Sequence, residues 1–245
     1  MSDSRPSALR FTPYGWPEPG PDYLAPTAFL DHDHPRVRDF VATALGDDGA
    51  SASPRDRAIR LFVAVRDAIR YDPYQVDLEG TGFRASEVLR LGSGFCVPKA
   101  VLLAACARSA GIPAAIGTSD VVNHFTSPKL LERMGGHDVF MHHGWAALHL
   151  DGQWVKAVPA FNRELCERMG VPPTDFDGVH DAVLQTFDAN GRQVMSYLKD
   201  HGVWSDLPLA RIRADYEAYY PMDRLSRPAS DEVFEFSPRP TDAGD

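Results

Sequence analysis

The sequence predicts a single α+β domain in which one buried helix packs against an antiparallel β-sheet. With 245 residues, 44% of them apolar, the chain can bury one substantial core. Residues 96–110 are apolar on nearly every side of a helix, which predicts that this helix lies in the interior. Residues 139–161 hold two apolar runs around Asp151-Gly152, the pattern of an antiparallel hairpin.

The ends of the chain differ in composition from its middle. Residues 1–28 contain six prolines and predict an extended arm that lies on the domain or in solvent and carries no chemistry. Residues 226–245 are rich in Pro, Ser and acidic side chains and predict a flexible tail. Residues 29–225 are therefore expected to form the domain.

Helix starts and stops can be located by their capping residues. Ser53 with Pro54 and Ser86 precede apolar-periodic segments, and Gly111 with Pro113 ends the buried helix. The predicted helices cover residues 35–45, 54–70, 87–91, 96–110, 163–169 and 209–220. A strand over 114–122 and a loop with one helical turn over 127–136 are expected before the hairpin.

The charge balance excludes several classes of partner. The net charge is −9 and no block of Lys and Arg occurs, so neither nucleic acid nor an anionic membrane is an expected partner. The N-terminus lacks the apolar segment of a secretory signal, which makes the cytoplasm the default location. Cys96 and Cys106 share one predicted helix roughly 15 Å apart, so the cysteines are expected to be free thiols.

Cys96 is the thiol best placed for chemistry. It follows Gly92 and Gly94 and stands where the buried helix begins, so unpaired amides and the helix dipole are expected to lower its pKa from about 8.5. The alternative is that Cys96 is a small buried hydrophobic residue. Cys106, in mid-helix, and Cys166, in a peripheral turn, fit that alternative better.

A reactive thiol needs a base, and the segment MHHGWAALHL offers three histidines. His142 and His143 are expected on opposite faces of the strand, because strand side chains alternate. His149 shares a face with His143 but lies about 20 Å further along. Taken singly, a strand histidine is more often an ordinary packed or surface residue.

The two segments together resemble the transglutaminase-like superfamily. The resemblance rests on GSGFC-x-x-KA-x-LLAA-x-x-R-x-x-GIPA followed by HGW and DG-x-W, over about residues 60–162. It implies a papain-like and transglutaminase-like fold, with Cys96 as nucleophile and His143 as base. Trp145 and Trp154 are the aromatic residues of the second motif, and Trp145 is a candidate for substrate binding.

The chain departs from the family where an aspartate usually follows the second tryptophan. That position is Val158, which cannot accept the second imidazole proton. Asn162 is the candidate replacement, because an asparagine has this role in papain-like enzymes, and a helix cap is its alternative role. Asp120 and Asp138 are further candidates.

Asn123 and His124 form a polar pair at the predicted end of the first long strand. They could contact substrate or donate to an oxyanion, or they could form a turn. His32 and His34, in DHDHP, fit a solvated turn. No His or Cys pair has the spacing of a zinc site, so neither a metal nor another cofactor is expected.

The resemblance implies acyl transfer on an amide or ester of a peptide or small molecule, with water or an amine as acceptor. The motif does not choose between hydrolysis and transfer, and it leaves the oligomeric state open. Two alternatives remain. One is a non-catalytic binding protein that has kept the fold, and the other is a thiol-imidazole lyase or isomerase acting on a small molecule.

Overall fold

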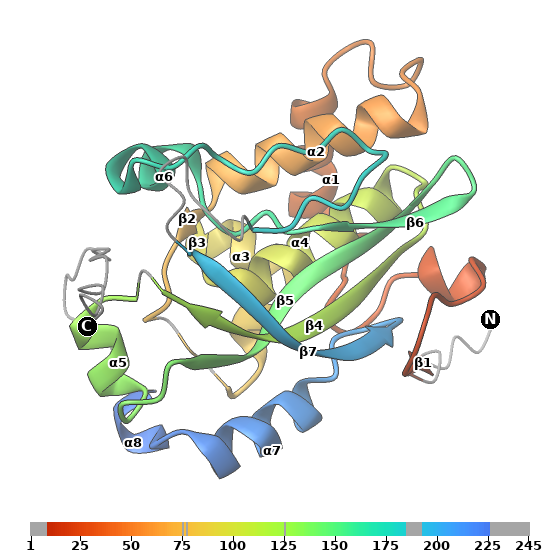
Figure 1. The fold of residues 1–245 in the computed structure, drawn as a ribbon. Helices are drawn as coiled ribbons and strands as arrows, with labels where there is room; N and C mark the ends of the chain where they lie inside the picture. The colour runs from red at the N-terminus through yellow and green to blue at the C-terminus, as the bar shows by residue number, and fades with distance from the viewer. Residues whose placement is uncertain (1–8, 75, 77, 125, 185–192, 226–245) are drawn as a thin grey trace.

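The computed structural model describes residues 9–74, 76, 78–124, 126–184 and 193–225 (Figure 1). The first helices are α1 (Pro35–Leu45), α2 (Pro54–Ala68) and α3 (Ala85–Leu91). The Ser53 side chain accepts a hydrogen bond from the Asp56 amide and Pro54 occupies the first turn, so α2 begins as predicted. Gly92 ends α3 in the left-handed conformation.

Helix α4 (Cys96–Ser109) is the centre of the domain. All its residues from Cys96 to Arg108 are buried. It packs against the sheet on one side and against α1, α2 and α3 on the other, as Figure 1 shows. The prediction of a buried helix against an antiparallel sheet is confirmed.

The main sheet has five strands in the order β1-β7-β4-β5-β6, and every neighbouring pair is antiparallel. Its strands are β1 (Phe11–Thr12), β4 (Ala114–Asn123), β5 (Val139–Leu150), β6 (Gln153–Ala157) and β7 (Met195–Trp204). Asp151 and Gly152 both have positive φ, as the predicted two-residue turn between β5 and β6 requires. A second, parallel pair joins β2 (Arg70–Tyr71) to β3 (Ser93–Gly94).

Two buried basic side chains hold α4 in place. Lys99 donates hydrogen bonds to the carbonyls of Arg66 and Ile69, which close the C-terminal end of α2 (2.8 and 2.6 Å). Burial lowers the pKa of Lys99 to about 7. The Arg108 guanidinium donates to the carbonyls of Ala25, Ala114 and Ser205, three segments that are distant in sequence. These two motif residues therefore have structural roles.

The described part of the N-terminal arm lies on the domain. Strand β1 pairs with β7, and the short 3-10 helix η1 (Pro21–Tyr23) buries Tyr23. Trp154 donates its indole N–H to the carbonyl of Pro17 at 2.7 Å. A second 3-10 turn, η2 (Thr81–Phe83), precedes α3.

The C-terminal half contains an element that the sequence did not predict. Strand β7 lies in a segment expected to be loop, between residue 170 and the helix at 209. The helices of this half are α5 (Pro128–Arg133), α6 (Arg163–Met169), α7 (Leu209–Tyr219) and α8 (Met222–Leu225). The predicted flexible tail, 226–245, lies outside the described residues.

Candidate active site

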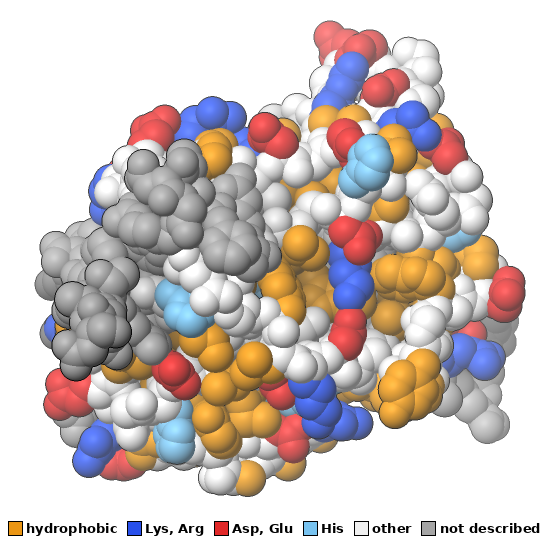
Figure 2. Space-filling model, in the orientation of Figure 1, with side chains coloured by type: hydrophobic (Ala, Val, Ile, Leu, Met, Phe, Trp, Pro, Cys, Tyr) orange, Lys and Arg blue, Asp and Glu red, His pale blue; other side chains and the backbone are white. Residues whose placement is uncertain are grey.

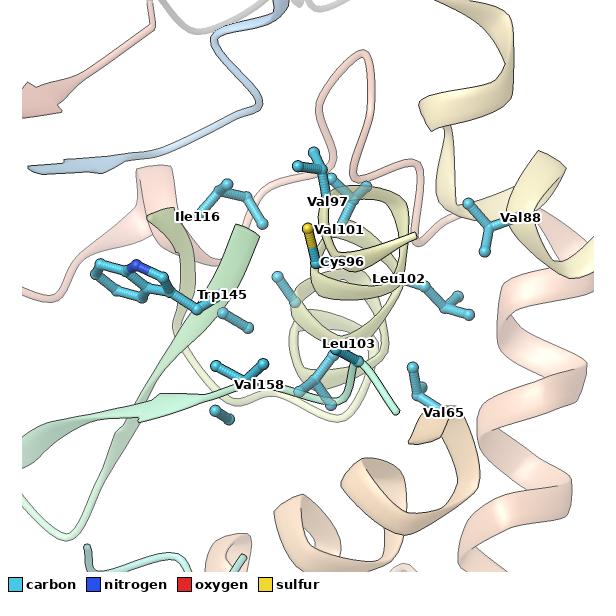
Figure 3. Packing of buried hydrophobic residues seen from close by; sticks show 14 of the residues in the cluster. Val65, Val88, Cys96, Val97, Val101, Leu102, Leu103, Ile116, Trp145 and Val158 are labelled. Atoms are coloured by element: carbon cyan, nitrogen blue, oxygen red, sulfur yellow. The ribbon is translucent and has the colours of Figure 1, made fainter. Parts of the chain in front are cut away.

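Cys96 is the first residue of α4. Phe95 occupies the cap position with extended backbone, and β3 leads directly into the helix. The sulfur lies at the first turn of the helix (Figure 3). Only 6% of the residue is exposed.

His143 lies on β5, opposite Ser119 of β4. The next residue, Gly144, brings the strand against the first turn of α4, since a Cβ at Gly144 would lie 2.6 Å from the Val97 Cα atom. The close approach requires glycine at this position. Cys96 and His143 consequently line the same pocket.

Burial favours the neutral forms of both the thiol and the imidazole. Burial raises the pKa of Cys96 to about 12, although the backbone N–H groups of Gly144, Val97 and Cys96 itself act in the lowering direction. Burial lowers the pKa of His143 to about 4. The sequence predicted a lowered thiol pKa from the helix start, and that prediction is wrong for this structure because the loss of solvent outweighs the amides.

The His143 ring has no hydrogen-bond partner among the described residues. Neither Nδ1 nor Nε2 is bonded, although both are buried. The Cys96 sulfur therefore does not share a hydrogen bond with the imidazole. An unbonded ring in an apolar pocket can receive a proton from a thiol, or bind a polar group of a substrate, once a ligand enters.

Burial of His143 predicts an acid-sensitive fold. The imidazole titrates near pH 6.5 when unfolded and near pH 4 when folded, so its contribution is zero above pH 6.5 and destabilising below it. We expect the free energy of unfolding to fall by about 2–3 kcal/mol between pH 6.5 and pH 4.5 from this residue alone. Urea titrations of the wild type and of His143→Gln measure the difference, with His149→Gln as matched control. Equal pH dependence in the wild type and in His143→Gln would contradict the prediction.

Asn162 does not hydrogen-bond the imidazole, whose ring nitrogens have no partner among the described residues. Its Oδ1 atom accepts the backbone N–H of Tyr71 at 3.1 Å, and its side chain makes no capping bond to α6. It therefore does not orient the ring in this structure, and it occupies the cap position of α6, its alternative role, through its backbone alone. Val158 is 1% exposed and belongs to the apolar core around α4 (Figure 3).

The aspartate candidates have other partners. Asp120 accepts hydrogen bonds from His201 Nε2 and from the backbone N–H of His142. Asp138 does not bond the imidazole either, because both His143 ring nitrogens are without partners in the described structure.

The three residues predicted to bind substrate lie elsewhere. Trp145 donates to Ser119 Oγ at 3.0 Å and lies under Lys156, whose Nζ atom is 4.3 Å from the ring centroid. His124 bonds Ser196 Oγ, and Asn123 is buried at the end of β4. None of the three lines the pocket of Cys96 and His143.

His142 is the centre of a network that the sequence did not predict. Its φ of +55° marks a bulge in β5, where the register against β4 shifts. The ring bonds Thr118 Oγ1 and Asp215 Oδ2 at 2.9 and 2.6 Å, and it stacks on His201 at 4.2 Å. Since Asp215 and His201 lie on α7 and β7, no local motif could have predicted these contacts.

The described residues give no indication of a metal. Within the described ranges, no group of three or more His, Cys, Asp or Glu side chains is arranged to hold one.

Among the residues that the structure describes, no helix is both long enough and apolar enough to cross a bilayer. On the face drawn in Figure 2, the Lys and Arg side chains alternate with Asp and Glu.

Three solved structures resemble this fold. A candidate cysteine protease from Cytophaga hutchinsonii has 15% identity and a TM-score of 0.43, and the match covers 74% of this chain and 52% of that one. A candidate protease from Parabacteroides distasonis has 16% identity and a TM-score of 0.35, over 52% and 25% of the two chains. The arylamine N-acetyltransferase from Mycobacterium abscessus has 14% identity and a TM-score of 0.44, over 81% and 74%. This chain thus spans about half of the first structure and a quarter of the second.

One family model matches the sequence of this chain. No curated protein matches the chain at a significant level. The model of the transglutaminase-like superfamily matches residues 38–159, from α1 to just beyond β6, and so includes both Cys96 and His143. The chain belongs to the transglutaminase-like superfamily.

Proposed function

We propose that the chain is a cysteine-dependent enzyme that takes an acyl group from an amide or ester and passes it to water or to an amine. The observation that carries the proposal is that Cys96, at the start of α4, and His143, on β5, line one pocket. The backbone N–H groups of Gly144 and Val97 lie at the sulfur and supply donors for a developing oxyanion. The proposed substrate is a peptide or a small molecule.

The first half of the reaction transfers the acyl group to sulfur. The Cys96 sulfur attacks the carbonyl carbon while its proton moves to His143, and the carbonyl oxygen becomes an oxyanion facing the amides. The intermediate then collapses, the C–O or C–N bond breaks, and His143 returns the proton to the leaving group. A thioester on Cys96 remains.

The second half returns the enzyme to its starting state. Water or an amine attacks the thioester carbonyl and gives a proton to His143. The C–S bond breaks, and the proton passes back to the sulfur as the acid or amide leaves. Because burial favours the neutral thiol and imidazole, proton transfer accompanies bond formation in this scheme and no ion pair precedes it.

An ester that reports its own cleavage tests the proposal. We expect p-nitrophenyl acetate to release p-nitrophenol and to leave one acetyl group on Cys96, located by mass spectrometry of the digested protein. Decay of that adduct in water, compared with decay in the presence of an added amine, separates hydrolysis from transfer. Acetylation confined to surface lysines would contradict the proposal.

A binding protein without catalysis is the second candidate. It is favoured by the unbonded ring of His143 together with Val158 at the position of the family aspartate. In that case an apolar ligand would raise the midpoint of thermal unfolding. Ligand-induced stabilisation with no adduct on Cys96 under any condition would favour the binding protein over the enzyme.

A further inference from the structure

The described walls of the candidate active-site pocket are mainly apolar. Apart from Cys96 and His143, its described lining consists of aliphatic, aromatic and methionine side chains and one proline. No Asp, Glu, Lys or Arg is among these lining residues. The space in the pocket that can hold the centre of a water molecule is about 40 Å³.

Tyr216 of α7 and Tyr220, the residue after its end, present ring carbon atoms to the pocket, because their hydroxyls are bonded to β5. The Tyr216 hydroxyl donates to the carbonyl of Met141 at 3.1 Å. The Tyr220 hydroxyl donates to the carbonyl of Val139 at 2.7 Å and accepts the Met141 N–H at 2.8 Å. These bonds fix both rings against the strand that carries His143.

The opposite walls are also apolar. Helix α5 and its C-terminal end contribute Leu130 and Met134, and both residues are 2% exposed. Phe140 and Met141 of β5 line the pocket and are partly buried. A carboxylate or ammonium group that entered would lose its water without gaining a charged partner among the described lining residues.

We propose that this pocket binds the acyl side of the substrate and selects an uncharged, apolar acyl group, aliphatic or aromatic. The inference rests on the proposed function, since it places the acyl group beside the sulfur that attacks its carbonyl. Each buried methylene group should raise the rate of acylation by about fourfold until the pocket is full. A terminal carboxylate should lower it.

A series of p-nitrophenyl esters tests this preference on the intact chain. The rates of p-nitrophenol release from the acetate, butyrate, hexanoate, benzoate and hemisuccinate esters are each divided by the rate of the same ester with free N-acetylcysteine. We expect the hexanoate or benzoate ester to exceed the hemisuccinate ester by at least about tenfold, from burial of apolar groups and desolvation of the charge. This measurement does not depend on any variant folding.

A charge placed in the wall should change the preference. Met141→Lys alters only the side chain, so the backbone bonds of Met141 to the two tyrosines can persist. We expect it to raise the rate of the hemisuccinate ester relative to the hexanoate ester by at least about tenfold. Leu198→Lys, at a residue that is 57% exposed on β7 and does not line this pocket, is the matched control and should leave the ratio unchanged.

The outcomes separate the two proposals. Acylation of Cys96 that is equally fast with the hexanoate and hemisuccinate esters would overturn the apolar preference and leave the enzyme proposal standing. A rate ratio that Met141→Lys does not move would also overturn it. Absence of any adduct on Cys96, the acetate ester included, would overturn the proposed function and with it this inference.

Discussion

Replacing Cys96 by alanine should abolish p-nitrophenol release from p-nitrophenyl acetate and the acetyl adduct on this residue. Without the sulfur no thioester forms, and the remaining donors can only stabilise attack by water. We expect the rate to fall by at least about a thousandfold, down to the reaction of ester in buffer. The measurement is the steady-state rate at pH 7, with circular dichroism to show that the variant is folded.

Cys106→Ala is the matched control. Cys106 lies on the same helix, is fully buried, and has its pKa raised by burial as Cys96 does. The two thiols differ in position, because only Cys96 lines the pocket with His143. Cys106→Ala should therefore keep the ester activity within about twofold, since its side chain touches no reacting atom. Comparable losses in both variants would show that the loss comes from packing in α4 and would contradict the nucleophile assignment.

Local signals in the sequence predicted most of the helices. Ser53 with Pro54 marked the start of α2, and the all-round apolar run marked α4. Such signals depend on residues within one or two helical turns, so they can be recognised without knowing the rest of the fold. The turn at Asp151-Gly152 predicted the β5-β6 hairpin for the same reason.

Strand β7 escaped prediction because its residues do not alternate. Positions 197–200 are all exposed, and the register of β7 against β4 shifts twice along the pair. The strand exists because β4 and β1 pair with it, and those partners are about 80 and 190 residues away in the sequence. The run of exposed residues breaks the alternation that would have indicated a strand.

The candidate site, like the fold, was predicted only where local signals were present. The two motifs predicted Cys96 and His143 as the reacting pair, but a local motif carries no measure of how deeply each side chain is buried. The pocket that buries them is lined in part by Tyr216 of α7 and by Tyr220 just after it, more than 70 residues beyond the histidine. The same distance explains why the thiol pKa was predicted in the wrong direction, since the helix-start amides are local and the desolvation is not.

The glycine of the HGW motif should control both the fold and the site. At Gly144 a methyl group would lie 2.6 Å from the Val97 Cα atom and 3.1 Å from its backbone nitrogen, and backbone atoms cannot move aside by rotating. Gly144→Ala should therefore push β5 away from the first turn of α4 and separate His143 from Cys96. We expect a loss of about 3 kcal/mol in the free energy of unfolding, which corresponds to a fall of roughly 6–12 °C in Tm.

The displacement should lower the rate of ester cleavage by the Gly144→Ala variant at least about a hundredfold, because a shift of 1 Å in reacting groups has that effect. The rate is measured below the Tm of the variant. Gly20→Ala is the matched control, because Gly20 has an extended backbone and a Cβ there would meet no atom within 4 Å. It should leave Tm and rate unchanged. A Gly144→Ala variant with wild-type stability and activity would mean that β5 and α4 do not meet at this glycine, and that the thiol and imidazole are brought together by other contacts.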